Sequence, residues 1–122
     1  MTALTDLTWA EVETATGTTG AISIVGTAPN AKVVIDVSLL TGTAIGDLSS
    51  GGVVDFLLKL REACAAAQIT ANANQNVGER LATFPALVYG NLASDGTVQV
   101  QGSIVGKMTV SPQTLHLIGV NN

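Results

Sequence analysis

The sequence predicts an α+β fold in which antiparallel strands, arranged as a sheet, a sandwich or a small barrel, pack with one main amphipathic helix. Three observations lead to this prediction. Apolar residues recur at helical spacing over 53–67, a two-residue alternation runs over 97–110, and turn sequences separate the candidate strands. The 122 residues suffice for one core. We therefore expect a short helix and flexible arm over 1–20 and a single α+β domain over 21–122.

The N-terminal region combines a helix signal with a Thr/Gly-rich segment. Thr8 and Glu11 have the spacing of a capping box, which predicts a short helix beginning at Trp9. Residues 14–20 contain four Thr and two Gly and no large apolar side chain. This composition predicts an arm that is mobile in the isolated chain and becomes ordered only in an assembly.

Residues 21–40 predict two strands joined by a turn. Ile22 and Ile24 lie on one face of the first strand, and apolar residues at every second position from Val33 to Leu39 define the second. The segment 27–30, Thr-Ala-Pro-Asn, supplies the turn, with Pro expected at the second turn position and Asn at the third. A β-hairpin is the expected result.

The clearest element is a helix that begins at Val53 and ends between Ala67 and Thr70. Asp55 lies in the first turn, where the helix dipole favours a negative charge, and it precedes Lys59 by four residues. Charged residues and Gln68 are expected off the apolar stripe. Residues at i, i+3, i+4 and i+7 spacing form this stripe: Val53, Phe56, Leu57, Leu60, Cys64 and Ala67.

The last third of the chain is predicted to be rich in strands. An apolar strand is expected over 81–92, interrupted by Pro85, and 94–96, Ser-Asp-Gly, predict a hairpin turn. The alternation over 97–110 indicates either one long strand or two strands that keep the phase, with bends at Gly102 and Gly106. A short final strand is expected over 115–120.

The charge content excludes several classes of partner. Charged residues make up 11% of the chain, against about 25% in an ordinary globular protein, while 47% of the residues are hydrophobic. The five basic residues are scattered and the net charge is −4, so we expect no nucleic-acid and no membrane partner. No apolar run approaches the roughly 18 residues of a membrane span, and no secretory signal is evident, so synthesis in the cytoplasm is expected.

No catalytic, cofactor-binding or metal-binding constellation is predicted. His116, the only histidine, lies in an ordinary strand pattern, and Cys64, the only cysteine, lies on the apolar stripe of the helix. We therefore expect Cys64 to be a core residue. The acidic residues lack the spacing of a calcium loop, and no phosphate-binding or dinucleotide-binding glycine motif occurs.

In composition and order of elements the chain resembles the small structural proteins of tailed-phage particles. The features that carry the resemblance are the Thr/Gly segment 14–20, the single helix 53–67 between strand pairs, and the polar-faced strand 97–110. The resemblance implies a non-enzymatic subunit of the virion, in capsid decoration, the tail or the connector. It implies homo-oligomerisation, contacts with other virion proteins, and no cofactor.

The expected mode of action is symmetric self-association, because a surface poor in charge is desolvated at low cost. Two alternatives remain open, a small-molecule-binding module of a bacterial protein and a small enzyme that uses Cys64 and His116. The candidate assembly surface is the polar face of the last long strand: Thr97, Gln99, Gln101, Ser103, Lys107 and Thr109.

Overall fold

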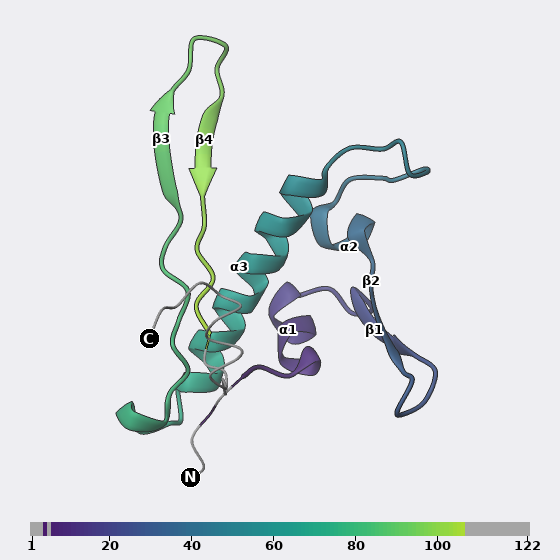
Figure 1. Cartoon of the computed structure of the whole chain (residues 1–122), viewed down its shortest axis with the longest axis vertical. Helices are drawn as coiled ribbons and strands as arrows, with labels where there is room; N and C mark the ends of the chain where they lie inside the picture. The colour runs from purple at the N-terminus through teal and green to yellow at the C-terminus, as the bar shows by residue number, and fades with distance from the viewer. Residues whose placement is uncertain (1–3, 5, 107–122) are drawn as a thin grey trace, which may run out of the picture.

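The computed structural model describes residue 4 and residues 6–106 of the chain. A long helix runs through the middle, with a helix and a hairpin on one side of it and a second hairpin on the other (Figure 1). The α+β class is therefore confirmed, with the described strands in two separate antiparallel pairs. The elements are α1 (Trp9–Thr16), β1 (Ile22–Val25), β2 (Lys32–Ile35), α2 (Val37–Thr41), α3 (Val53–Asn72), the 3₁₀ helix η1 (Val77–Glu79), β3 (Val88–Leu92) and β4 (Val98–Gln101).

Helix α1 begins with the predicted capping box. The backbone N–H of Glu11 donates to Thr8 Oγ1 at 3.2 Å, and the backbone N–H of Thr8 donates to Glu11 Oε1 at 2.7 Å. The helix continues to Thr16 and ends at Gly17, which adopts a left-handed conformation with φ of 71°. The first three residues of the segment 14–20 are thus helical rather than part of an arm. The mobility of the rest of that segment in the isolated chain stays a prediction.

The predicted first hairpin is confirmed over β1 and β2, where Ile22 lies opposite Ile35. Pro29 occupies the third position of its turn rather than the second, because the N–H of Asn30 donates to the carbonyl of Thr27 at 3.0 Å. The extension of the second strand to residue 39 is wrong. Asp36 Oδ1 accepts a hydrogen bond from the N–H of Leu39 at 3.0 Å, and this cap begins α2 instead.

The main helix is confirmed as α3, which continues to Asn72. Its predicted apolar stripe is only partly buried. Ala67 belongs to the core, and Leu60 and Cys64 pack against that core, whereas Val53 and Leu57 are exposed. The core lies between α1, β1 and the second half of α3, so these elements bury only the later part of the stripe. Its central members are Val12, Ile22, Ala63 and Ala67.

The second hairpin, β3 with β4, forms around the predicted turn, but both strands are shorter than expected. Residues 81–87 form no strand, and β4 ends at Gln101, with 102–106 also outside any strand. On both sides of the hairpin the backbone forms hydrogen bonds with side chains of α3 instead of with a neighbouring strand. The predicted strand 115–120 and the continuation of the alternation over 107–110 lie outside the described residues.

Among the described helices, none combines the length and apolar character that crossing a bilayer requires.

Candidate functional site

A stripe of buried polar side chains on α3 anchors the second hairpin. Arg61, Gln68 and Asn72 are separated by seven and four residues, which places them on one side of the helix. They are 6%, 5% and 9% exposed. The apolar pattern of the helix predicts Arg61 and Gln68 off the buried face, and this prediction is wrong. Their shared helical spacing was the signal that could have identified them.

These side chains bond to the backbone of the segment that follows η1. Asn72 both accepts from the N–H of Leu81 at 2.7 Å and donates to the carbonyl of Leu81 at 3.1 Å. Gln68 Oε1 accepts from the N–H of Phe84 at 2.9 Å. Residues 81–87 have no strand partner, so the amide side chains of α3 satisfy backbone groups that would otherwise be buried without hydrogen bonds.

Arg61 joins the two ends of the hairpin at its root. Its Nε donates to the carbonyl of Ser103 at 3.0 Å, and its guanidinium also donates to the carbonyl of Pro85. The guanidinium lies 5.6 Å from the centre of the Phe84 ring and pairs with Glu62 Oε1 at 2.5 Å. One side chain therefore holds the segment before β3 and the segment after β4 against α3.

Beyond this root the hairpin extends away from the rest of the molecule (Figure 1). Every residue from 88 to 99 is exposed, and Val100 is half-buried. In the register, Tyr89 lies opposite Val100 and Leu92 opposite Val98, with a bulge between Tyr89 and Leu92. Residues opposite each other share a face of the sheet, so the bulge brings four apolar side chains to one face. We call these four, Tyr89, Leu92, Val98 and Val100, the hairpin face.

The predicted assembly residues lie on other parts of this hairpin. Gln99 and Gln101 alternate with the hairpin face along β4 and therefore occupy the opposite face of the sheet. Thr97 lies at the turn, where its N–H and its hydroxyl donate to Asp95 Oδ1 at 3.0 and 2.6 Å. Ser103 follows the end of β4 at the hairpin root. All four are exposed.

Two of the predicted assembly residues, Lys107 and Thr109, lie outside the described residues. The alternation over 97–110 predicted that Val98 and Val100 share a face, but the addition of Tyr89 and Leu92 was missed, because it depends on a bulge in β3 that no residue pattern marks.

Comparisons of the chain with family models, with curated proteins and with solved structures find no match.

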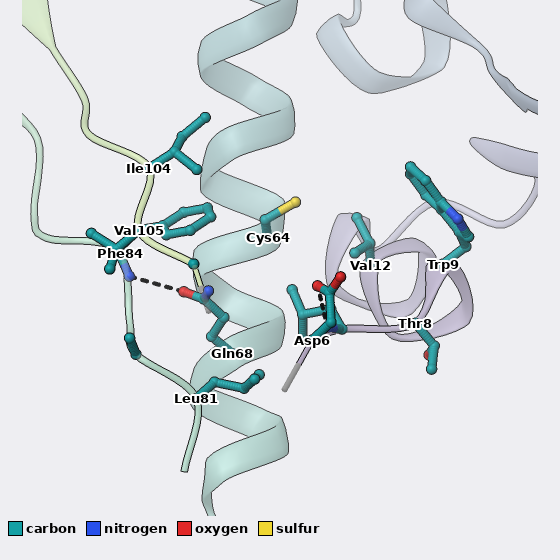
Figure 2. A pocket seen from close by; sticks show the side chains of 13 residues that line it. Asp6, Thr8, Trp9, Val12, Cys64, Gln68, Leu81, Phe84, Ile104 and Val105 are labelled. Atoms are coloured by element: carbon teal, nitrogen blue, oxygen red, sulfur yellow. Dashed lines mark hydrogen bonds between the residues drawn. The ribbon is translucent and has the colours of Figure 1, made fainter. Parts of the chain in front are cut away.

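A mostly apolar groove of about 320 Å³ lies between α1, α3 and two segments beside them (Figure 2). Three of the polar side chains at its wall form hydrogen bonds with neighbouring groups of the chain. Thr8 takes part in the capping box, Gln68 accepts from the N–H of Phe84, and Asp6 Oδ1 accepts from the N–H of Leu7 at 2.7 Å. The lining residues are Asp6, Leu7, Thr8, Trp9, Val12, Cys64, Gln68, Leu81, Ala82, Phe84 and 104–106.

Cys64 lies at this groove and is half-buried beside the core. Burial raises the pKa of its thiol, and the negative charge of Asp6 raises the pKa further. An activated cysteine nucleophile needs a lowered pKa, so the direction is the opposite of what catalysis requires. His116 lies outside the described residues. Within the described part of the chain, no three His, Cys, Asp or Glu residues gather where they could hold a metal ion.

Proposed function

We propose that the chain is a non-enzymatic structural subunit that acts by symmetric self-association, and that it serves in the particle of a tailed phage. The observation that carries this proposal is the β3–β4 hairpin, whose residues 88–99 are exposed on both faces. A two-stranded hairpin is at best marginally stable in water, and it becomes stable when a face is packed. The hairpin face is therefore a surface that a partner would cover.

The composition of the hairpin supports the same proposal. Proteins protect free sheet edges with Lys, Pro or inward-pointing charges. Between residues 88 and 101 the only charged residue is Asp95, which lies in the turn, and there is no Pro. Both strands are thus edge strands without the usual protection against contact with another chain.

The oligomeric state tests the first half of the proposal. Size exclusion with light scattering on the full chain, across a wide range of concentration, is expected to reveal a discrete oligomer that forms as the concentration rises. A strict monomer at the highest concentration, which also fails to join purified particles, would contradict the proposal.

The virion assignment rests on the resemblance to small phage proteins in composition and order of elements, and it can be tested separately. We expect the gene to lie beside capsid, portal or tail genes, and the protein to sediment with purified particles. A gene neighbourhood of metabolic enzymes, together with absence of the protein from particles, would remove the virion assignment and leave self-association standing.

The groove supports a second candidate, a module that binds a small apolar molecule. Its volume is at the lower end of the range for ligand pockets, and its wall is mainly apolar. Trp9, the only tryptophan, and Cys64, the only cysteine, both line it. A ligand found by native mass spectrometry that shifts Trp9 fluorescence and protects Cys64 from a thiol reagent would favour this candidate.

A further inference from the structure

We infer that the groove between α1 and α3 binds a small neutral molecule with an apolar body and a carbonyl oxygen, and that this oxygen accepts a hydrogen bond from the side-chain amide of Gln68. The inference rests on the second candidate function, a module that binds a small molecule, and adds the class of ligand and the residue that recognises it. It does not depend on self-association, which involves the hairpin.

Gln68 uses only half of its side-chain amide within the fold. The residue is 5% exposed, and its Oε1 accepts a hydrogen bond from the N–H of Phe84 at 2.9 Å. This bond fixes which end of the amide carries the oxygen, so Nε2 lies on the side away from the N–H of Phe84 (Figure 2). Within the described part of the chain, no group accepts a hydrogen bond from Gln68 Nε2. Two N–H donors of a buried side chain are therefore left without a protein partner.

Asn72, one turn farther along α3, shows the complete set of bonds that Gln68 lacks. Its amide accepts from the N–H of Leu81 at 2.7 Å and donates to the carbonyl of Leu81 at 3.1 Å. The nitrogen of Gln68 is not sealed off from solvent, since the one side-chain atom of the described residues that is fully enclosed without a partner is Gln75 Oε1. Because Gln68 lines the groove, its free donors are available to a molecule bound there.

The space beside Gln68 has the size and the walls of a small ligand site. The groove has a volume of about 320 Å³, and apolar side chains such as Leu81, Phe84 and Val105 form most of its wall. At ~30 Å³ for each water-sized group, this volume holds about ten non-hydrogen atoms. Apolar walls with a few placed polar groups are the usual construction of a ligand pocket, in which the polar groups fix the orientation of the ligand.

The charge at the groove favours a neutral ligand over an anion. Of the described residues that line the groove, Asp6 alone is charged. Burial raises the pKa of the Cys64 thiol at the same wall, and the negative charge of Asp6 raises it further, so the field of Asp6 extends to this side chain. A carboxylate or phosphate in this space would lose its hydration and meet a like charge. A neutral acceptor avoids both costs.

A carbonyl oxygen is the neutral acceptor that fits this wall. It accepts hydrogen bonds and brings no donor of its own, whereas a hydroxyl group adds a proton that also needs an acceptor. The hydroxyl of Thr8, at the same wall, already accepts from the N–H of Glu11 and donates to the Glu11 carboxylate. The structure therefore favours a ketone or ester carbonyl on an apolar body.

Three probes of the same shape test the inference on the ¹⁵N-labelled full chain. Acetophenone carries the carbonyl, isopropylbenzene replaces its oxygen by a methyl group, and benzoate replaces its methyl group by a second, charged oxygen. The NMR shift of the Trp9 indole N–H reports binding of each probe, because Trp9 lines the groove and is the only tryptophan. Acetophenone is expected to bind more tightly than benzoate and to shift the side-chain N–H signals of Gln68.

Variants of Gln68 separate the hydrogen bond from simple apolar binding. Gln68→Met removes the donor and keeps the length of the side chain. It should weaken acetophenone about three- to tenfold, the contribution of one hydrogen bond, and leave isopropylbenzene within about twofold. Gln68→Glu keeps an acceptor for the N–H of Phe84, loses the amide donor, and provides a second variant if Gln68→Met fails to fold.

Two further variants serve as controls. Gln99→Met makes the same change at an exposed position of the hairpin and should alter the affinity for neither probe. Asp6→Asn keeps the acceptor for the N–H of Leu7 and removes the charge, so it should strengthen benzoate and leave acetophenone unchanged. Circular dichroism and thermal melting verify that each variant is folded.

The outcomes separate this inference from the candidate function on which it rests. If acetophenone and isopropylbenzene both bind and neither depends on Gln68, the groove binds apolar molecules but the carbonyl inference is overturned. Benzoate that binds more tightly than acetophenone overturns the ligand class. Absence of binding by all three probes removes the second candidate function as well. A Trp9 signal that shifts with protein concentration alone would show that a second copy covers the groove, which also overturns the inference.

Discussion

Arg61 is the side chain that connects α3 to both ends of the second hairpin. A buried guanidinium is costly unless its N–H groups are bonded, and here they donate to the carbonyls of Pro85 and Ser103 and to Glu62. The flat guanidinium also faces the Phe84 ring. Charge, hydrogen bonding and ring packing thus combine at one residue.

Gly102 makes the close approach to Arg61 possible. A Cβ at this position would lie 2.6 Å from Arg61 Nε and 2.9 Å from Leu87 Cδ2. Gly102→Ala is therefore expected to destabilise the fold by about 1–3 kcal/mol, the usual cost of overpacking. Urea denaturation would measure this loss.

The control is Gly46→Ala, because a Cβ at Gly46 would meet nothing within 4 Å. This change is expected to alter the stability by less than about 0.5 kcal/mol. Equal stabilities of the two variants would show that Arg61 moves aside without cost.

Cys64 is expected to behave as a packing residue rather than a reactive one. It is half-buried against the core, and burial raises the pKa of its thiol, so less thiolate is present at neutral pH than at an exposed cysteine. Native Cys64 should react with a thiol reagent more slowly than Cys64 in denaturant. Equal rates would contradict this placement.

Substitutions on the same stripe test the packing role. Cys64→Ala should cost less than about 1 kcal/mol, whereas Leu60→Ala should cost about 2 kcal/mol, near the low end for leucine because Leu60 is only half-buried. A loss at Cys64 that equals or exceeds the loss at Leu60 would show that the thiol does more than fill space.

At the scale of elements, the β3–β4 hairpin depends on its turn. The carboxylate of Asp95 accepts hydrogen bonds from the hydroxyl and the N–H of Thr97, and these bonds lower the pKa of Asp95. A lowered folded-state pKa means that the stabilisation is complete above the ordinary aspartate value of about 4 and is lost as the pH falls through the folded-state value.

We therefore expect the turn to loosen in acid, with the NMR shift of the Thr97 N–H following the protonation of Asp95. Asp47, whose pKa is lowered in the same way by Ser49, provides an internal reference in another loop. Asp95→Asn should abolish the pH dependence of the Thr97 shift and leave that of Ser49 unchanged. A titration of Asp95 at or above the ordinary value would contradict the expectation.

At the scale of the whole molecule, the described residues contain two ion pairs, Lys59 with Asp55 and Arg61 with Glu62. Neither belongs to the hairpin face. Salt screens interactions between exposed charges and leaves apolar contacts intact. An oligomer that forms through the hairpin face should therefore depend little on ionic strength.

The expected result is a dissociation constant that changes less than about threefold between ~50 mM and ~1 M NaCl, measured by light scattering or sedimentation. The comparison of chloride with sulfate serves as the control, because sulfate strengthens apolar association and should tighten the oligomer. A large loss of affinity at high salt would point to ion pairs between subunits and contradict the apolar contact.

The sequence by itself determined the elements whose signals are local. The capping box of α1, the hairpin around Pro29, the main helix and the turn at Asp95 each depend on residues within a few positions of one another. Such signals act through short-range hydrogen bonds and helical spacing, so they persist in the fold. The α+β class follows from them.

Only the tertiary structure decided how these elements are covered. The helix cap at Asp36 begins α2, although the apolar alternation after residue 35 predicted that the strand would continue. Arg61, which is distant in sequence, bonds to the carbonyl of Ser103 just after the early end of β4. The apolar alternation correctly placed Val98 and Val100 on one face of β4. It did not indicate whether another segment would bury that face. Burial depends on which segments meet in space, and in the described part of this chain the hairpin extends beyond the core that could have covered it.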